Sequence, residues 1–150
     1  MEATPPGRAQ LRCCDASGCR SGGGARLLAA LREAVAVLAE DAPQVRPVGC
    51  LRLCGRGPLV ACDGPDGTTL FGDLDAQCSG ELLTLASGRP LTEAKAESLE
   101  RHRLDPDQPF FALQRPLVLE HCGLLDPESL EEALTAGAYS QLQRCLQELT

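Results

Sequence analysis

The sequence predicts an α/β fold with a helical C-terminal segment. Between residues 10 and 87, short apolar stretches of strand length alternate with longer stretches whose apolar residues recur every three or four positions. Glycine and proline mark the boundaries of these stretches, as expected for turns between strands and helices. The chain has 150 residues, which allows one domain with an appendage or two very small domains.

The first predicted elements are a strand, a helix and a second strand. "AQLRCC" (residues 9–14) has the short alternating pattern of a strand, and "CRSGGG" after it breaks regular structure. "ARLLAALREAVAVLAED" (residues 25–41) predicts a helix, because apolar residues recur at helical spacing from Leu27 to Leu38. Pro43 ends this helix, and "QVRPVG" (residues 44–49) predicts the second strand.

A hairpin and a closing helix complete this predicted unit. "PLVACDG" (residues 58–64) and "TTLFGDL" (residues 68–74) predict two strands joined at "GPDG", and "DAQCSGELLTLAS" (residues 75–87) predicts a helix. The order over residues 10–87 is therefore β-α-β-β-β-α. This order matches a thioredoxin-like layout, in which a crossover helix joins two strands and a hairpin and a terminal helix follow.

The remaining segments have a different character. Residues 1–9 predict a disordered lead, and the polar, charged segment 88–109 predicts a linker with one or two exposed helical turns. Residues 110–150 predict a helical hairpin, in which Asp126 caps the first helix and Gly137 ends it. The second helix carries Leu142, Leu146 and Leu149 on one side, which suggests a docking arm for a partner or a contact between two copies.

Charge and hydropathy exclude several classes of function. The net charge of −7 and the scarcity of aromatic residues argue against nucleic acid as a partner. The charge is unevenly distributed, with a net charge of +3 on residues 1–60 and of −10 on residues 61–150. No apolar run approaches the roughly 20 residues that span a bilayer, and "MEATPPGRAQ" lacks the apolar core of a secretory signal. We therefore expect a cytoplasmic protein, in which clustered cysteines are metal ligands or redox groups rather than structural disulfides.

Four of the nine cysteines form two close pairs, Cys14–x4–Cys19 and Cys50–x3–Cys54. Each pair follows a predicted strand, and a β-α-β crossover returns the chain to the same end of a sheet. We therefore expect the four thiolates to converge, as they would around one [2Fe–2S] cluster with two thiolates per iron. Structural zinc favours C-x2-C knuckles and a thioredoxin-type dithiol needs C-x-x-C, and neither pair has that spacing.

Basic residues and glycines surround the two pairs. Cations near cluster sulfurs raise a reduction potential, and glycine lets the backbone approach closely, so both residue types fit a cluster; solvated arginines and ordinary loop glycines are the alternative interpretation. The flanking residues are Arg12, Arg20, Arg52 and Arg56, together with Gly18, Gly22, Gly23, Gly24, Gly55 and Gly57.

With these residues in view, "CCDASGC…GCLRLCGRGPLV" resembles the thioredoxin-like [2Fe–2S] ferredoxin module of the NADH-dehydrogenase part of respiratory complex I and its relatives. It is similar to the form fused to the diaphorase subunit of NAD-linked bidirectional hydrogenases, and NAD-linked formate dehydrogenases carry a comparable fusion. The segment "PFFALQRPLVLEHCGLLDPESLEEALTAGAYSQLQRCL" resembles the opening of the flavin-binding subunit itself. The resemblance covers about residues 10–150, and the family's cluster ligands fall on Cys14, Cys19, Cys50 and Cys54.

The resemblance implies an electron-transfer protein with a [2Fe–2S] cofactor and with flavin- and iron–sulfur-containing subunits as partners. The family's flavin and nucleotide loop and its four-iron-cluster cysteines do not occur in this sequence. We therefore expect no FMN or NADH site and no hydride chemistry in this chain, which would be a fragment or a split gene product. A non-redox docking module and a zinc-stapled domain remain the alternatives.

The other cysteines and both histidines have simpler explanations. Cys13 alternates to the opposite face of its strand from Cys14, so we expect it to be buried without binding metal. Cys62 and Cys78 are expected in the core, and Cys122 and Cys145 in packing contacts of the C-terminal segment. His121 beside Cys122 lacks a third ligand, His102 is expected in solvent, and the isomer of Pro58 is open.

Overall fold

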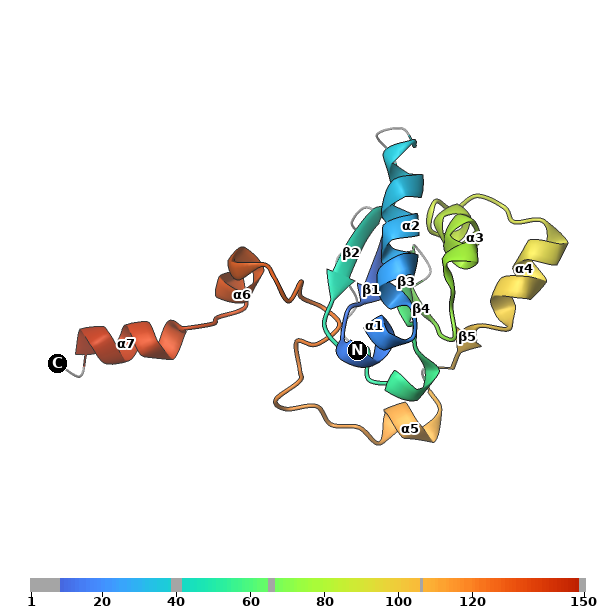
Figure 1. The fold of residues 1–150 in the computed structure, drawn as a ribbon. Coiled ribbons are helices and arrows are strands. Elements are labelled where there is room, and N and C mark those ends of the chain that lie inside the picture. The colour runs from blue at the N-terminus through green and yellow to red at the C-terminus, as the bar shows by residue number, and fades with distance from the viewer. Residues whose placement is uncertain (1–8, 39–41, 65–66, 106, 149–150) are drawn as a thin grey trace.

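The computed structural model describes residues 9–38, 42–64, 67–105 and 107–148. Its centre is a five-stranded sheet in the order β2-β1-β3-β4-β5, in which β1 and β2 are parallel and every other neighbouring pair is antiparallel (Figure 1). The strands are β1 (Gln10–Cys14), β2 (Gln44–Val48), β3 (Val60–Gly64), β4 (Gly67–Phe71) and β5 (Arg103–Leu104).

The helices are α1 (Ser17–Ser21), α2 (Gly24–Ala36), α3 (Ser79–Ala86), α4 (Glu93–Glu100), α5 (Pro109–Ala112), α6 (Leu130–Thr135) and α7 (Ser140–Glu148), with the short 3-10 turns η1 (Cys54–Arg56) and η2 (Ala76–Cys78). Helices α2 and α3 cover one face of the sheet, and α6 and α7 lie to one side of it (Figure 1). The predicted β-α-β-β-β-α order is confirmed, and the first strand, the second strand and the hairpin lie where the sequence places them. The helix expected at 25–41 is shorter, ending at Ala36, and α1 was not predicted.

The larger core lies between the sheet and helices α2 and α3. Leu11 and Cys13 of β1 point into it, and Leu27 and Leu31 of α2 meet them there with almost no exposed surface. Because side chains alternate along a strand, Arg12 and Cys14 point to the opposite face. A smaller cluster forms on that side from Cys14, Cys19, Leu59 and Leu104.

The segment expected as a linker, 88–109, is structured over residues 93–104. Helix α4 places Leu99 in the larger core, and β5 pairs with β4 and places Leu104 in the smaller cluster. The charged composition of α4 hid this contact, because a helix that packs through one leucine leaves most of its surface in solvent. A two-residue strand is also too short to show alternation.

The C-terminal segment contains the two expected helices, but they do not form a hairpin. Helix α7 continues outward from α6 instead of folding back along it (Figure 1). Gly137 follows the end of α6 with a positive φ of 91°, as predicted, whereas the N-cap is Ser129 and not Asp126. The side chain of Ser129 accepts a hydrogen bond from the Glu132 amide, and Asp126 instead accepts one from the Glu128 amide in the preceding turn.

Five expectations fall partly outside the described residues: the disordered lead at 1–9, the end of the helix at 25–41, the "GPDG" turn around 65–66, position 106 of the linker at 88–109, and Leu149 in the C-terminal helix. Among the helices of the described ranges, none is long and apolar enough to span a bilayer.

Candidate metal centre

The four paired cysteines lie at one end of the parallel strand pair. Cys14 is the last residue of β1 and Cys19 lies one turn into α1, while Cys50 follows β2 by two residues and Cys54 opens η1. β1 and β2 run parallel with Cys14 opposite Val48, so the segments that follow the two strands leave the sheet at the same end. The topology therefore brings the two pairs together as the sequence predicts.

Distances and electrostatic contacts join the four sulfurs. Cys50 Sγ and Cys54 Sγ are 3.6 Å apart. The Cys19 thiol donates a hydrogen bond to Cys14. The two pairs also affect each other, because charge on Cys54 acts on Cys19 and charge on Cys14 acts on Cys50. The described part of the chain holds no group of three or more His, Cys, Asp or Glu side chains close enough for a single metal ion.

Burial divides the site into an inner and an outer side. Cys14 and Cys19 are buried, Cys50 is half-buried and Cys54 is exposed. The hydrogen bond from Cys19 lowers the pKa of the Cys14 thiol to about 6, and the same bond raises the pKa of Cys19. Burial raises the pKa of Cys50. The site thus has a buried inner side at Cys14 and Cys19 and a solvent-facing side at Cys54.

Glycines border the sulfurs closely. A Cβ at Gly57 would lie 2.9 Å from Cys19 Sγ, and one at Gly18 would lie 3.3 Å from the Cys54 Cβ. Gly24 is constrained in the same way, because its Cβ would lie 2.8 Å from the Cys19 carbonyl oxygen. Gly55 has open space around it, so that position is an ordinary loop glycine. The Gly57–Pro58 peptide, whose isomer the sequence left open, is cis.

Three of the four arginines near the cysteine pairs form ion pairs with carboxylates, and do not act on the cysteines as free positive charges. Arg20 pairs with Asp15, and Arg56 pairs with Asp73. Arg12 is buried against Asp63. These carboxylates offset most of the positive charge expected around the site.

Arg52 contributes through its backbone instead. Its amide donates a hydrogen bond of 3.3 Å to Cys50 Sγ, and Arg52 itself has a left-handed φ of 70°. A backbone donor at a sulfur is a contact that holds the thiolate in place.

The remaining cysteines belong to neither pair, although Cys122 lies beside Gly49, next to Cys50. Cys13 and Cys62 lie in the larger core, where burial raises the pKa of Cys13 to about 12 and that of Cys62 to about 11. Cys78 packs partly against the same core. The packing role expected for Cys145 is wrong, because Cys145 is exposed on α7. Cys122 is half-buried, and its Sγ would lie 3.5 Å from a Cβ on Gly49.

The histidines do not join the site. His102, expected in solvent, is half-buried and its Nδ1 lies 3.0 Å from the Gly72 carbonyl oxygen. His121 is exposed, and its Nε2 lies 3.5 Å from Glu120 Oε1.

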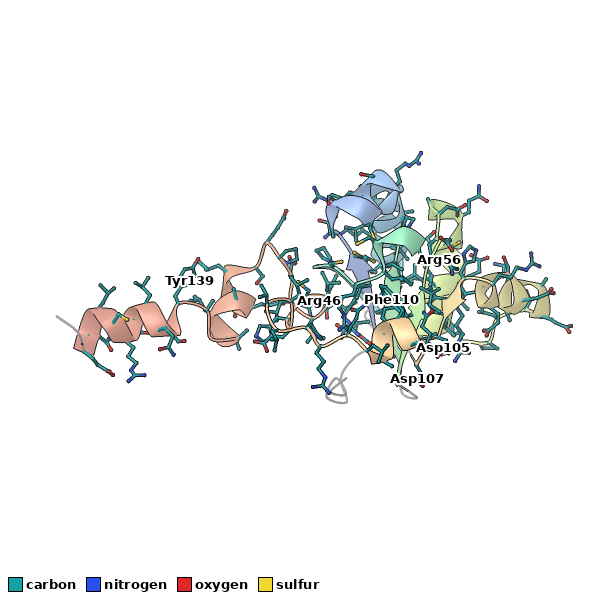
Figure 2. The ribbon with its side chains drawn as sticks, turned by 90° about the horizontal axis from the view of Figure 1, so that it is seen from below. Arg46, Arg56, Asp105, Asp107, Phe110 and Tyr139 are labelled. Atoms are coloured by element: carbon teal, nitrogen blue, oxygen red, sulfur yellow. The ribbon has the colours of Figure 1, made fainter. Side chains whose placement is uncertain are left out.

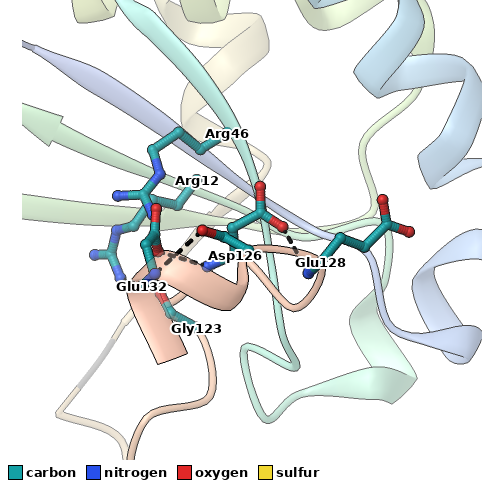
Figure 3. Close-up of polar contacts among 7 residues, drawn as sticks. Arg12, Arg46, Gly123, Asp126, Glu128 and Glu132 are labelled. Atoms are coloured by element: carbon teal, nitrogen blue, oxygen red, sulfur yellow. Dashed lines mark hydrogen bonds and ion pairs between the residues drawn. The ribbon is translucent and has the colours of Figure 1, made fainter. Parts of the chain in front are cut away.

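One part of the site was missed by sequence reasoning. Residues 121–132 return to the sheet beside Cys50. Arg12 donates to the Gly123 carbonyl and Arg46 pairs with Glu132 (Figure 3). The Gly49 amide donates to the Leu125 carbonyl. Gly123 is fully enclosed by this contact. No periodicity or motif signals it, because the contacts are polar and join residues far apart in the chain.

Fold and site together define a thioredoxin-like α/β protein with four converging cysteines. No protein-family model and no curated protein matches the chain. Among solved structures, it is similar to the wild-type thioredoxin-like [2Fe–2S] ferredoxin from Aquifex aeolicus, with 20% identity, a TM-score of 0.50, and coverage of 65% of this chain and 96% of that one. A cysteine-to-serine variant of that ferredoxin matches with 19% identity, the same TM-score, and coverage of 65% and 98%. This likeness establishes the shared fold.

Proposed function

We propose that the chain is an electron carrier that holds one [2Fe–2S] cluster on Cys14, Cys19, Cys50 and Cys54. The observation that carries the proposal is the convergence of two cysteine pairs from adjacent parallel strands onto one edge of the sheet. When bound, such a cluster accepts and returns one electron. The fold shared with a [2Fe–2S] ferredoxin supports this function.

The residues present fit a two-metal centre better than a single zinc ion. Two thiolates on one tetrahedral metal with bonds of about 2.3 Å lie about 3.8 Å apart. Cys50 Sγ and Cys54 Sγ are 3.6 Å apart, which suits one metal per pair. A single structural zinc needs three or four donors around one point, and the described residues offer no such group.

The surroundings give each side of the site a separate role. Gly57 and Gly18 leave room beside the sulfurs, and the smaller cluster with Leu59 and Leu104 keeps water from Cys14 and Cys19. Cys54 is exposed, so a redox partner can approach the site from that side. We propose that this partner is a flavin- and iron–sulfur-containing subunit of an NAD(P)H-linked oxidoreductase, as in a hydrogenase diaphorase or a complex I-like module, and that the protein works in the cytoplasm.

Metal analysis and spectroscopy of anaerobically purified protein test the cofactor. The proposal predicts iron, acid-labile sulfide, a visible charge-transfer spectrum and an EPR signal after one-electron reduction. Serine at Cys14, Cys19, Cys50 or Cys54 is expected to abolish or strongly reduce these features. The matched control is Cys145→Ser, which changes an exposed thiol far along the chain. A colourless protein with zinc and no iron would establish the zinc-stapled alternative instead.

A docking module without redox activity is the second candidate, and one observation favours it. Tyr139 and Leu142 are exposed on the arm formed by α6 and α7, which extends away from the sheet (Figure 2). Replacing Cys14 and Cys50 with serine separates the candidates from each other. If the double variant still supports electron transfer in a reassembled complex while Leu142→Glu prevents assembly, the docking function is correct.

A further inference from the structure

We propose that residues 121–132, here called the strap, form an outer wall of the cysteine site and restrain the loop that carries Cys50. The inference rests on the proposed function, because it assigns a role toward the metal centre to residues outside the four ligands. Three separate contacts carry it: a buried arginine, a half-buried ion pair and a backbone-to-backbone approach beside Cys50.

The first contact is made by Arg12 from the middle of the sheet. Its guanidinium donates two hydrogen bonds to Asp63, of 2.7 and 2.8 Å, and its Nη1 donates to the Gly123 carbonyl. Asp63 also accepts a hydrogen bond from Thr68, so the carboxylate is fixed from two strands. A guanidinium held in this way points its Nη1 donors in a defined direction, and the strap supplies an acceptor for one of them.

The second contact fixes the far end of the strap. The carboxylate of Glu132 pairs with Arg46 of β2 and also accepts a hydrogen bond of 2.9 Å from the Asp126 amide (Figure 3). Glu132 thus closes the turn 126–132 on itself and ties it to the strand next to β1. The pair is about one-third exposed at Glu132 and one-fifth exposed at Arg46 (34% and 21%). An ion pair this close to solvent contributes little energy, and it can open without leaving a buried charge.

The third contact places the strap on the Cys50 loop itself. Gly123 has a positive φ of 83°, and a Cβ there would lie 2.8 Å from Leu51 Cδ2 and 3.5 Å from the Cys50 carbonyl oxygen. Two residues away, the Gly49 amide donates to the Leu125 carbonyl at 3.4 Å. Glycine at 123 lets the two backbones meet here, whereas a Cβ at Gly49 would make only ordinary contacts of 3.5 Å with Cys122. Outward movement of the Cys50 loop would displace the strap.

The nature of these contacts allows the strap to separate from the sheet and from the Cys50 loop. If it lifts, Arg12 keeps both bonds to Asp63 and no described charge becomes buried without a partner. What is lost is one hydrogen bond from Arg12, the half-buried Arg46–Glu132 pair, the hydrogen bond from the Gly49 amide to the Leu125 carbonyl and the packing of Gly123 on Leu51. The docked strap therefore restrains the backbone of the Cys50 loop, and the released strap frees that loop.

Hydrogen–deuterium exchange of the full-length, metal-free protein tests this restraint directly. Glu132→Arg removes the pair with Arg46 and sets two cations against each other, so amide exchange in residues 49–54 is expected to rise about two- to fivefold. Adding Arg46→Glu restores an ion pair and is expected to return exchange toward the wild-type rate. Glu131→Arg makes the same charge change at the neighbouring exposed position and is expected to have no effect there. Gly123→Ala, which sets a Cβ against Leu51, is expected to act like Glu132→Arg.

Unchanged exchange at 49–54 in Glu132→Arg and Gly123→Ala would overturn the inference, as would an equal rise in Glu131→Arg. The same variants, loaded with iron and sulfide, are expected to lose their visible absorbance to a chelator about two- to fivefold faster than wild type. Exchange is measured without metal, so a failure of the cluster proposal shows as absent iron in wild type and leaves the exchange result intact.

Discussion

Gly57 lies so close to Cys19 that a Cβ at position 57 would stand 2.9 Å from the cysteine sulfur. Glycine is therefore required there by contact with a candidate ligand. The same loop contains Gly55, which has no atom within 4 Å of its Cβ position. These two glycines provide a matched test of the site.

Gly57→Ala is expected to displace the Cys19 sulfur, to destabilise the fold by about 1–3 kcal/mol and to lower the iron retained after purification. Iron per chain and the urea midpoint measure the two effects. Gly55→Ala should match wild type in both. Full iron content in Gly57→Ala would show that this glycine does not shape the site.

Cys13 and Cys14 are neighbours with opposite environments, so they should respond differently to serine. Cys13→Ser places a hydroxyl in the larger core and is expected to cost about 1–3 kcal/mol while iron content stays at the wild-type value. Cys14→Ser is expected to lose the iron. Metal analysis and thermal unfolding of both variants check this, and loss of iron from a well-folded Cys13→Ser would contradict the assignment.

Asp63 predicts a pH dependence of stability. Burial alone would raise its pKa, but hydrogen bonds from Arg12 and Thr68 outweigh burial and hold the pKa below the ordinary value. A carboxylate whose pKa is lower in the folded state stabilises the fold above its unfolded pKa of about 3.9, and this contribution is lost as pH falls through the folded value. Asp63→Asn is therefore expected to cost about 3 kcal/mol at pH 7 and progressively less below about pH 4.

Unfolding by urea at neutral and acidic pH measures this effect. Asp107→Asn is the control, because its side chain is exposed and should leave stability unchanged at either pH. A cost of Asp63→Asn that is independent of pH would show that the ionised carboxylate is not what stabilises the sheet.

Leu99 tests whether the segment after α3 belongs to the domain. Leu99→Ala is expected to lower the free energy of unfolding by about 2–4 kcal/mol, because the side chain is buried in the larger core. Leu142→Ala, on an exposed face of α7, should change it by less than about 0.5 kcal/mol. Equal effects of the two substitutions would mean that α4 does not stabilise the fold.

Local sequence patterns predicted the parts of the fold that depend on local physics. The helical spacing from Leu27 and the alternation before Cys14 each reflect burial within one element. The glycines between β3 and β4 indicate that these neighbouring strands pair, and the sheet follows from joining these elements. The placement of Leu104 could not be predicted in this way. Its strand has two residues, and its burial depends on β4 and on Leu59 far along the chain.

The candidate site shows the same division. Cys14, Cys19, Cys50 and Cys54 stand out by spacing, and the crossover rule brings them together. Sequence proximity suggested that Arg12 and Arg56 would act on the cysteines, but Asp63 and Asp73 pair with them through tertiary contacts. Gly123 packs against the Leu51 side chain and the Cys50 carbonyl from a distant segment, and a lone glycine in a turn does not predict this contact.

The most direct test of the central claim is the metal and sulfide content of the anaerobically purified full-length chain, with EPR after reduction. The account predicts about two iron atoms and two sulfides per chain and a one-electron EPR signal that serine at Cys14 or Cys50 removes and Cys145→Ser leaves intact. Zinc at about one per chain without iron, or a full cluster in the Cys14 and Cys50 variants, would contradict it.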